Sequence, residues 1–166
     1  MQNKVPKYFL SHNPSKCKKH RSVIETDKWK ESSLRVAIYC RTPIDDSSAF
    51  SLQREQYKKW LEQYPHWTLA DFYTEHDRET CGEFNRMTGD AEAGKLDLII
   101  VKSLSTFRRN IVDCVSAIRT LLRLQPPVGV YFESENFCSL SQGSKYLLPA
   151  MMELAVEESN RKNETL

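Results

Sequence analysis

Charged and hydroxyl-bearing residues follow three apolar runs of this chain, in the segments 41–46, 75–78 and 102–109. If the runs are parallel strands, these segments meet beyond the carboxyl ends of one sheet, where sites form in open α/β folds. Guanidinium groups at such an edge can bind oxyanions through charge-assisted hydrogen bonds. Arg108 and Arg109 stand where a helix is expected to begin, and cations there oppose the helix dipole. The two arginines therefore indicate an anionic partner, with simple solvation as the alternative.

Short apolar runs alternate with helical patterns along the chain. Runs rich in strand-forming residues predict strands at 35–40, 67–74, 96–101 and 128–132. Apolar residues that recur at helical spacing predict helices over 50–64, 83–94, 110–124 and 143–163. This alternation predicts an α/β domain with a mainly parallel sheet of four to five strands, flanked by helices and followed by a long C-terminal helix. Tyr57, Trp60 and Tyr64 share one helix face and are expected in the core.

Charge is distributed unevenly along the 166 residues. The net charge is +2, but residues 1–34 hold eight Lys or Arg against three Asp or Glu, which is +5. We expect residues 1–33 to form a basic, disordered tail, with phosphate contact as the alternative role. Residues 34–142 are expected to form the α/β domain and residues 143–166 a long helix that is cut short at Leu166.

The five cysteines are odd in number and scattered, which favours reduced thiols over a disulfide framework. Cys17 and His20 have the spacing of half a zinc site, but no second pair follows at ligand spacing, so no metal is expected. The sequence shows no signal peptide and no apolar run of membrane-spanning length. We therefore expect a soluble, cytoplasmic protein without membrane contact.

Several segments together carry a family resemblance. At the end of the first predicted strand stands Tyr-Cys-Arg-Thr-Pro at 39–43, and after the third stands Lys-Ser-Leu-Ser-Thr-Phe-Arg-Arg-Asn at 102–110. With the segments 83–87, 94–100 and 154–159, they make residues 34–166 similar to the N-terminal catalytic domain of serine site-specific recombinases of the resolvase/invertase type.

The resemblance implies DNA as the partner and metal-free phosphoryl transfer that needs no cofactor. In this family a serine hydroxyl attacks the DNA phosphodiester and forms a phosphoserine link during strand exchange, while arginines neutralise the phosphoryl oxygens. The sequence departs from the pattern at the nucleophile position, which is Pro43 and has no hydroxyl. The first arginine of the turn after the third strand falls on Thr106, and a further arginine aligns with Cys81. We therefore expect a catalytically impaired domain.

The resemblance carries over individual site residues. Candidate catalytic positions are Arg41, Pro43, Ser105, Thr106 and Arg109, and candidate DNA-phosphate contacts are Arg41, Gln53, Arg108 and Arg109. A surface ion pair with Asp45 or Asp46 is an alternative role for Arg41. Surrogate hydroxyls are available nearby, although capping and strand packing also account for them: Thr42, Ser47 and Ser48.

The final helix of the family packs on a partner subunit and leads to a separate DNA-binding domain. No helix-turn-helix, zinc ribbon or strongly basic module follows here, so we expect no separate DNA-binding domain in this chain. Interface candidates are Leu147, Met151, Leu154 and Glu158. They are compatible with a homodimer or a complex with an active recombinase, and core packing alone is an adequate alternative explanation of the apolar residues on this helix. Three functions remain open: an impaired recombinase domain, an active recombinase with a surrogate hydroxyl, and a non-catalytic α/β interaction module.

Overall fold

The structure is a computed structural model that describes residues 28–42, 47–76, 81–141 and 143–164. One five-stranded sheet has the order β2-β1-β3-β4-β5. Its strands are β1 (Leu34–Thr42), β2 (Trp67–His76), β3 (Leu98–Val101), β4 (Gly129–Phe132) and β5 (Phe137–Cys138). The first four run parallel to their neighbours, and β5 is antiparallel to β4. The predicted α/β fold class with a mainly parallel sheet is confirmed.

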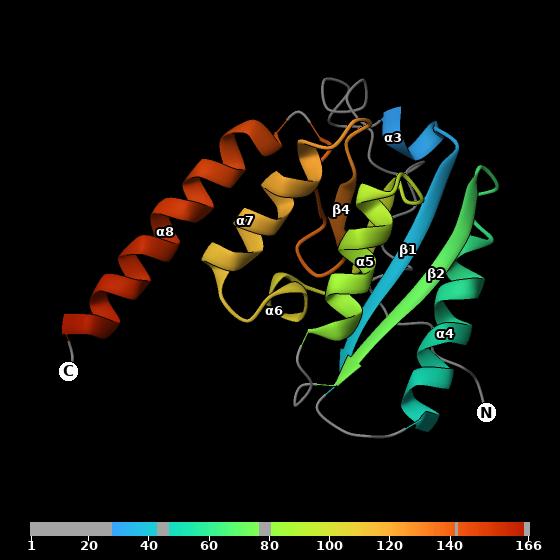
Figure 1. Cartoon of the computed structure of the whole chain (residues 1–166), viewed down its shortest axis with the longest axis horizontal. Coiled ribbons are helices and arrows are strands. Elements are labelled where there is room, and N and C mark those ends of the chain that lie inside the picture. The colour runs from blue at the N-terminus through green and yellow to red at the C-terminus, as the bar shows by residue number, and fades with distance from the viewer. Residues whose placement is uncertain (1–27, 43–46, 77–80, 142, 165–166) are drawn as a thin grey trace, which may run out of the picture.

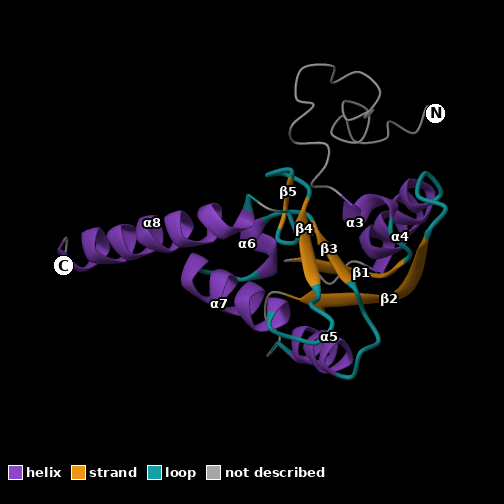
Figure 2. Ribbon diagram, turned by 90° about the horizontal axis from the view of Figure 1, so that it is seen from above, coloured by secondary structure: helices purple, strands orange, loops and turns teal. Residues whose placement is uncertain are grey.

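Helices cover both faces of this sheet (Figure 1). They are α3 (Lys28–Glu31), α4 (Ser47–Leu61), α5 (Gly82–Glu92), α6 (Leu104–Phe107), α7 (Ile111–Leu122) and α8 (Ser144–Glu164). Seen from above in Figure 2, α3 and α4 lie on one side of the sheet and α5 and α7 on the other. α8 packs along α7 and extends away from the sheet. No helix in the described ranges is long and apolar enough to cross a membrane.

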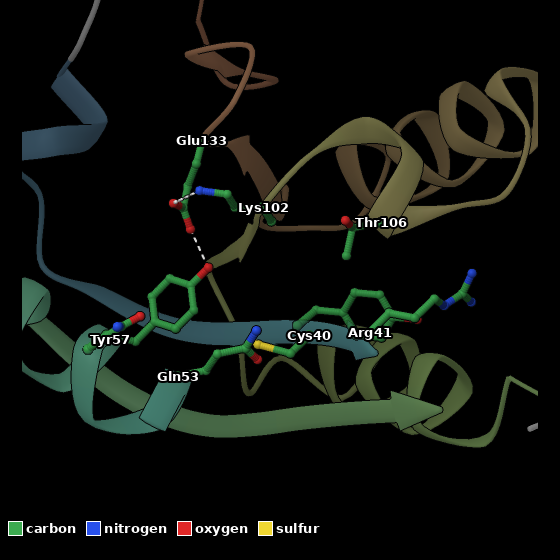
Figure 3. Close-up of a pocket in the computed structure, with 9 residues that line it drawn as sticks. Cys40, Arg41, Gln53, Tyr57, Lys102, Thr106 and Glu133 are labelled. Carbon is green, nitrogen blue, oxygen red and sulfur yellow. Dashed lines mark hydrogen bonds and ion pairs between the residues drawn. The ribbon is translucent and has the colours of Figure 1, made fainter. Parts of the chain in front are cut away.

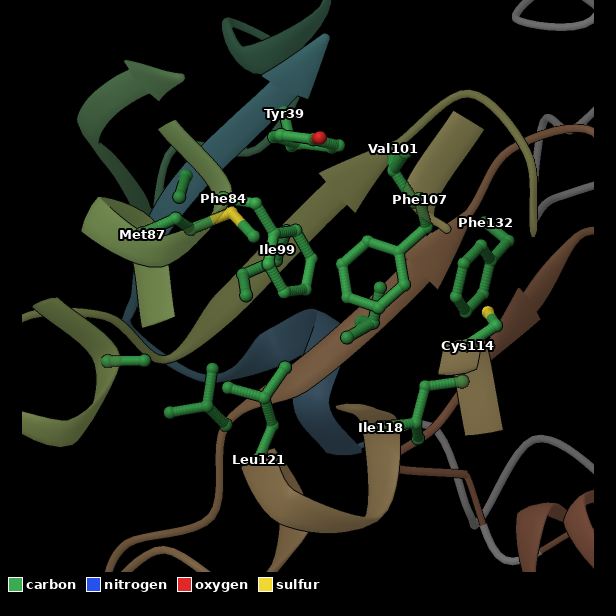
Figure 4. Packing of buried hydrophobic residues seen from close by; sticks show 14 of the residues in the cluster. Tyr39, Phe84, Met87, Ile99, Val101, Phe107, Cys114, Ile118, Leu121 and Phe132 are labelled. Carbon is green, nitrogen blue, oxygen red and sulfur yellow. The ribbon is translucent and has the colours of Figure 1, made fainter. Parts of the chain in front are cut away.

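The hydrophobic core consists of one cluster on each face of the sheet. Side chains alternate along β1, so that Val36, Ile38 and Cys40 pack toward α4, while Ala37 and Tyr39 pack toward α5 and α7. Figure 4 shows the cluster on the side of α5 and α7, in which aromatic rings meet edge to face. Burial on both faces explains why β1 and β3 read as continuous apolar runs.

The packed part of the chain begins before the predicted boundary at Leu34. α3 lies within the expected tail, and its Trp29 is buried. The Trp29 ring stacks on Trp67 with centroids 5.9 Å apart and lies 5.8 Å from the ring of Tyr131. A single aromatic residue in a polar, Lys-rich segment gives no periodic signal, which is why the sequence placed residues 28–33 in the tail. The rest of the predicted tail lies outside the described residues.

Two short elements, α6 after β3 and β5 after β4, lie in segments where the sequence predicted neither a helix nor a strand. α6 begins after Ser103, whose side chain accepts a hydrogen bond from the backbone N–H of Thr106 at 3.2 Å. β5 follows a turn in which Asn136 has a φ of 47°. Asn tolerates this left-handed conformation better than most residues, which lets the chain reverse and pair with β4.

Candidate functional site

A cavity of about 200 Å³ lies at the carboxyl ends of the parallel strands, where the sequence predicted a site. β1, α4 and the segments that follow β3 and β4 all contribute to it (Figure 3). The residues that line it are Tyr39, Cys40, Arg41, Gln53, Gln56, Tyr57, Lys102, Thr106 and Glu133. Among the described residues, no group of three or more His, Cys, Asp or Glu side chains is placed to hold a metal ion.

Arg41 is held at one side of the cavity by a buried carboxylate. Its Nη2 lies 3.5 Å from Oε2 of Glu75, which is only 1% exposed at the end of β2. The same oxygen accepts a hydrogen bond of 2.5 Å from the Tyr39 hydroxyl. Burial, together with this hydrogen bond, raises the pKa of Tyr39, so the tyrosine remains a donor. The predicted alternative partners, Asp45 and Asp46, lie outside the described residues.

A second buried carboxylate stands on the other side of the cavity. Glu133 follows β4, is 5% exposed, and accepts a hydrogen bond from the Tyr57 hydroxyl. Its Oε2 lies 3.7 Å from Nζ of Lys102. Burial raises the pKa of the Glu133 carboxyl, while the Tyr57 hydrogen bond and the Lys102 charge act in the opposite direction. The cavity therefore has two similar groups of tyrosine, carboxylate and cation on opposite sides.

Arg108 points away from the cavity. Its guanidinium lies over the ring of Phe84, with Cζ 4.6 Å from the centroid. Nη1 lies 3.8 Å from Sγ of Cys81, and Nη2 lies 3.9 Å from Oδ2 of Asp113. Cys81 precedes α5 and has a φ of 39°, a left-handed conformation that is unusual for a residue with a side chain.

Comparison with known proteins identifies the family. Residues 36–165 match the family model described as Resolvase, N terminal domain. This chain belongs to that family. The predicted resemblance to serine site-specific recombinases is thereby confirmed. No curated protein matches the sequence.

Two solved structures share the fold of this resolvase-family domain. The N-terminal catalytic domain of TP901-1 integrase is 21% identical, with a TM-score of 0.59, and the match covers 78% of this chain and 98% of that one. A resolvase family site-specific recombinase from Streptococcus pneumoniae is 22% identical, with a TM-score of 0.61, and the match covers 80% and 93%. At these identities the likeness shows the fold alone.

The resolvase-family fold gathers some of the predicted site residues. Arg41, Gln53 and Thr106 line one cavity although they come from three separate elements. Oε1 of Gln53 is buried, with no hydrogen-bond partner among the described residues. The Thr106 hydroxyl lies 2.9 Å from Oγ of Ser103. Ser105 is exposed, with its Oγ 3.0 Å from that of Ser103.

Other predicted residues lie elsewhere. Arg108 contacts α5, and Arg109 is exposed and does not line the cavity. Pro43 lies outside the described residues. On α8, Leu147 is exposed, whereas Met151 packs in the core of its own domain. The side chains of two further interface candidates are outside the described set: Leu154 and Glu158.

Two buried carboxylates were not predicted as site residues. Glu75 stands in a segment that the strand-end argument named, but no role was assigned to it. Glu133 follows β4, and the same argument applied to the fourth strand would have found it. The signal for Glu133 is a carboxylate directly after an apolar run, in Val-Tyr-Phe-Glu at 130–133, whereas Glu75 follows Thr74 at the end of the predicted strand 67–74.

Proposed function

We propose that this resolvase-family domain contacts DNA phosphate and takes part in strand exchange without cutting DNA itself. The observation that carries the proposal is the sequence Arg-Thr-Pro at 41–43, directly at the carboxyl end of β1. The retained Arg41 lines the cavity and can bind an oxyanion. Pro43 stands where the family has its serine, and proline has no hydroxyl with which to attack phosphorus.

The neighbouring hydroxyls are poorly suited to replace that serine. Thr42 is buried at the end of β1, and Ser47 and Ser48 begin α4, four and five residues beyond the nucleophile position. An in-line attack tolerates little displacement of the nucleophile, since a shift of about 1 Å can cost on the order of a hundredfold in rate. The surrogate hydroxyl is therefore the weaker alternative.

Weak electrostatic support for a transition state points the same way. Thr106 replaces a family arginine, and the nearby Arg108 is engaged with Phe84 and Cys81. Arg41 forms an ion pair with Glu75, which offsets part of its positive charge. Removing one positioned donor from a site that stabilises developing negative charge typically costs about 10²–10³ in rate. Ground-state binding of DNA phosphate tolerates these losses better than catalysis does.

DNA binding is tested by the anisotropy of a dye-labelled, mixed-sequence duplex over a salt series. The proposal expects affinity that falls linearly on a log–log salt plot, with a slope of roughly −0.9 per phosphate neutralised. Arg41→Ala is expected to weaken binding, and Lys59→Ala is the control that removes an exposed cation from α4. No binding by the wild-type protein at low salt would contradict the DNA role.

Cleavage is tested by searching for a covalent protein–DNA adduct on supercoiled plasmid under denaturing conditions. The wild-type protein is expected to form none, because no hydroxyl stands at the nucleophile position. An adduct formed by the wild-type protein and lost in Thr42→Val, Ser47→Ala or Ser48→Ala would identify a surrogate nucleophile and overturn the proposal of an impaired domain.

A second candidate function is subunit association through α8. Tyr146 is 81% exposed, Leu147 41% and Val156 50%, on a helix of 21 residues that extends from the domain. Exposed apolar residues along a projecting helix favour a protein partner, either a second copy or an active recombinase. Analytical ultracentrifugation should show self-association that Leu147→Asp combined with Val156→Asp abolishes. Leu52→Asp on α4 is the matched control, and a wild-type monomer at all concentrations would exclude the homodimer.

A cytoplasmic location belongs to the same proposal. None of the four described cysteines forms a disulfide bond, as expected in a reducing compartment.

A further inference from the structure

Glu133 is a buried carboxylate that the fold satisfies on one oxygen only. One oxygen accepts the hydrogen bond from Tyr57. The other, Oε2, is buried without a hydrogen-bond partner among the described residues, and its nearest cation is Lys102 at 3.7 Å. A buried acceptor without a hydrogen bond is costly, most of all when it is charged. Glu133 lines the cavity, so this cost falls directly on the candidate site (Figure 3).

The charge of Glu133 decides the net charge around the cavity. Arg41 and Lys102 supply two positive charges, and Glu75 and Glu133 supply two negative ones when both are ionised. The four charges then cancel. If Glu133 takes up a proton, the positive charges of this group exceed the negative ones by one. Unit charges at such a partly buried site interact several-fold more strongly than in bulk water.

We propose that Glu133 is a protonation switch for the phosphate site, so that the ionised carboxylate opposes a phosphodiester and the protonated carboxyl admits it. This inference rests on the proposed DNA-phosphate contact and adds its regulation. In the ionised state Glu133 attracts Lys102 and repels an incoming anion. In the protonated state it does neither, and Lys102 can turn to the phosphate.

The titratable groups that face Glu133 come from three elements of the fold. Tyr57 faces it from α4, Lys102 from the segment after β3, and Cys40 from β1. Burial raises the pKa of Glu133 above its ordinary value and raises that of Cys40 to about 12. Burial also raises the pKa of Tyr57. As the pH rises, the carboxyl therefore loses its proton before Tyr57 and Cys40 do.

A purely structural role for Glu133 makes a different prediction. If the carboxylate only anchors Tyr57, Glu133→Gln changes stability but leaves the affinity for anions as it was. The substituted amide would keep an oxygen to accept the Tyr57 hydrogen bond while removing the charge, so this variant separates the two roles.

The test is the ratio of dissociation constants of the wild-type protein and Glu133→Gln for a labelled duplex, measured from pH 8 to pH 5. A phosphodiester keeps its charge over this range. Histidine protonation acts equally on both proteins, so it cancels in the ratio. The switch predicts a ratio of about tenfold at pH 8, a typical effect of one partly buried unit charge, that decreases as the pH is lowered and Glu133 of the wild-type protein takes up its proton.

Two further variants make the test specific. Glu55→Gln on α4 removes the same charge from a side chain that is 67% exposed, so its ratio should stay near one at every pH. Tyr57→Phe removes a hydrogen bond that favours the ionised carboxyl, so its binding should strengthen at a higher pH than in the wild-type protein. A purely structural Glu133 would produce no such shift.

Sulfate binding, followed by NMR of the lysine ammonium groups, distinguishes failure of the protonation switch from failure of the proposed DNA contact. A ratio of one for DNA at every pH overturns the switch and leaves the DNA role intact. Absence of DNA binding by both proteins overturns the DNA role, and the sulfate ratio then decides the switch by itself. If neither protein binds sulfate at any pH, the switch is overturned as well.

Discussion

Glu75 depends on its neighbours because almost none of it reaches water. The Tyr39 hydroxyl donates to Oε2 at 2.5 Å, and Oε1 is buried without a hydrogen-bond partner among the described residues. Tyr39→Phe would remove the short hydrogen bond and leave the carboxylate less well satisfied. We expect it to lower the free energy of unfolding by about 1–3 kcal/mol, measured by urea denaturation. Tyr146→Phe, at an exposed hydroxyl, should change it by much less, and equal effects would contradict the assigned role of Tyr39.

Glu133 makes stability depend on pH in a defined direction. Its pKa in the folded protein lies above the ordinary value of 4.5. As pH rises from 4.5 through the folded pKa, the folded protein holds a proton that the unfolded chain has released, so the free energy of unfolding falls. Glu133→Gln lacks this group, and its stability relative to the wild-type protein should therefore improve as pH rises through this window.

Urea denaturation at a series of pH values measures the effect, with Glu55→Gln as the exposed control. A relative stability of Glu133→Gln that does not change with pH would show that burial leaves this carboxyl unperturbed.

The candidate site was only partly predictable at the level of residues. Strand ends located the region, and the family pattern supplied Arg41, Gln53 and Thr106, which the fold brings together. The orientation of Arg108 was not predictable, because it depends on the ring of Phe84 and the sulfur of Cys81 from α5. Contacts between distant elements leave no local trace in the sequence.

The packing of Leu140, which follows β5, against the first residue of β4 depends on a position that must be small. A Cβ at Gly129 would lie closer to Cγ of Leu140 than any ordinary contact. Gly129→Ala should therefore displace Leu140 and cost about 1–3 kcal/mol in the free energy of unfolding. In a Leu140→Ala background the same change should cost less, because the clash is gone.

A double-mutant cycle by urea denaturation measures this coupling, which is expected to be about 0.5–3 kcal/mol. Additive effects of the two substitutions would mean that the strand accommodates the extra methyl group by moving its backbone.

Elements with a clear apolar run or a helical period were predicted, and the shortest elements were missed. The continuous apolar run of β1 and the helical stripe of α7 identified both elements to within a few residues. α3, α6 and β5 contain only two to four residues, too few for any period to appear. Their existence depends on tertiary packing, such as burial of Phe107 of α6 between Tyr39 and Phe132.

The folded unit includes Trp29, which joins α3 to the core cluster on the α4 face of the sheet. Trp29→Ala would remove a buried ring that contacts Trp67 and Tyr131. We expect a loss of about 3 kcal/mol in the free energy of unfolding. Glu31→Ala, at an exposed position of the same helix, should have little effect.

Thermal unfolding monitored by circular dichroism compares the two variants. Equal melting temperatures would show that the domain begins at Leu34, as the sequence indicated. A deletion meant to test the basic tail should accordingly stop at residue 27, which leaves every described contact in place.

The three tryptophans of the chain lie in one place. Trp29 and Trp60 each have their ring 5.9 Å from that of Trp67, and the ring of Tyr64 stacks on Trp67 at 4.1 Å. Trp67 opens β2 and pairs with Leu34, whereas Arg41 lies at the opposite end of β1, roughly 20 Å away at about 3.3 Å per residue. Trp60, in contrast, lies one helical turn from Tyr57 on the Glu133 side of the cavity. The intrinsic ultraviolet emission of this protein is therefore a signal from a single spot that is remote from Arg41 but next to the Glu133 side. A ligand that contacts Arg41 alone should leave the emission maximum unchanged, and a shift on addition of DNA would report a change at α4 or a loosening of the fold.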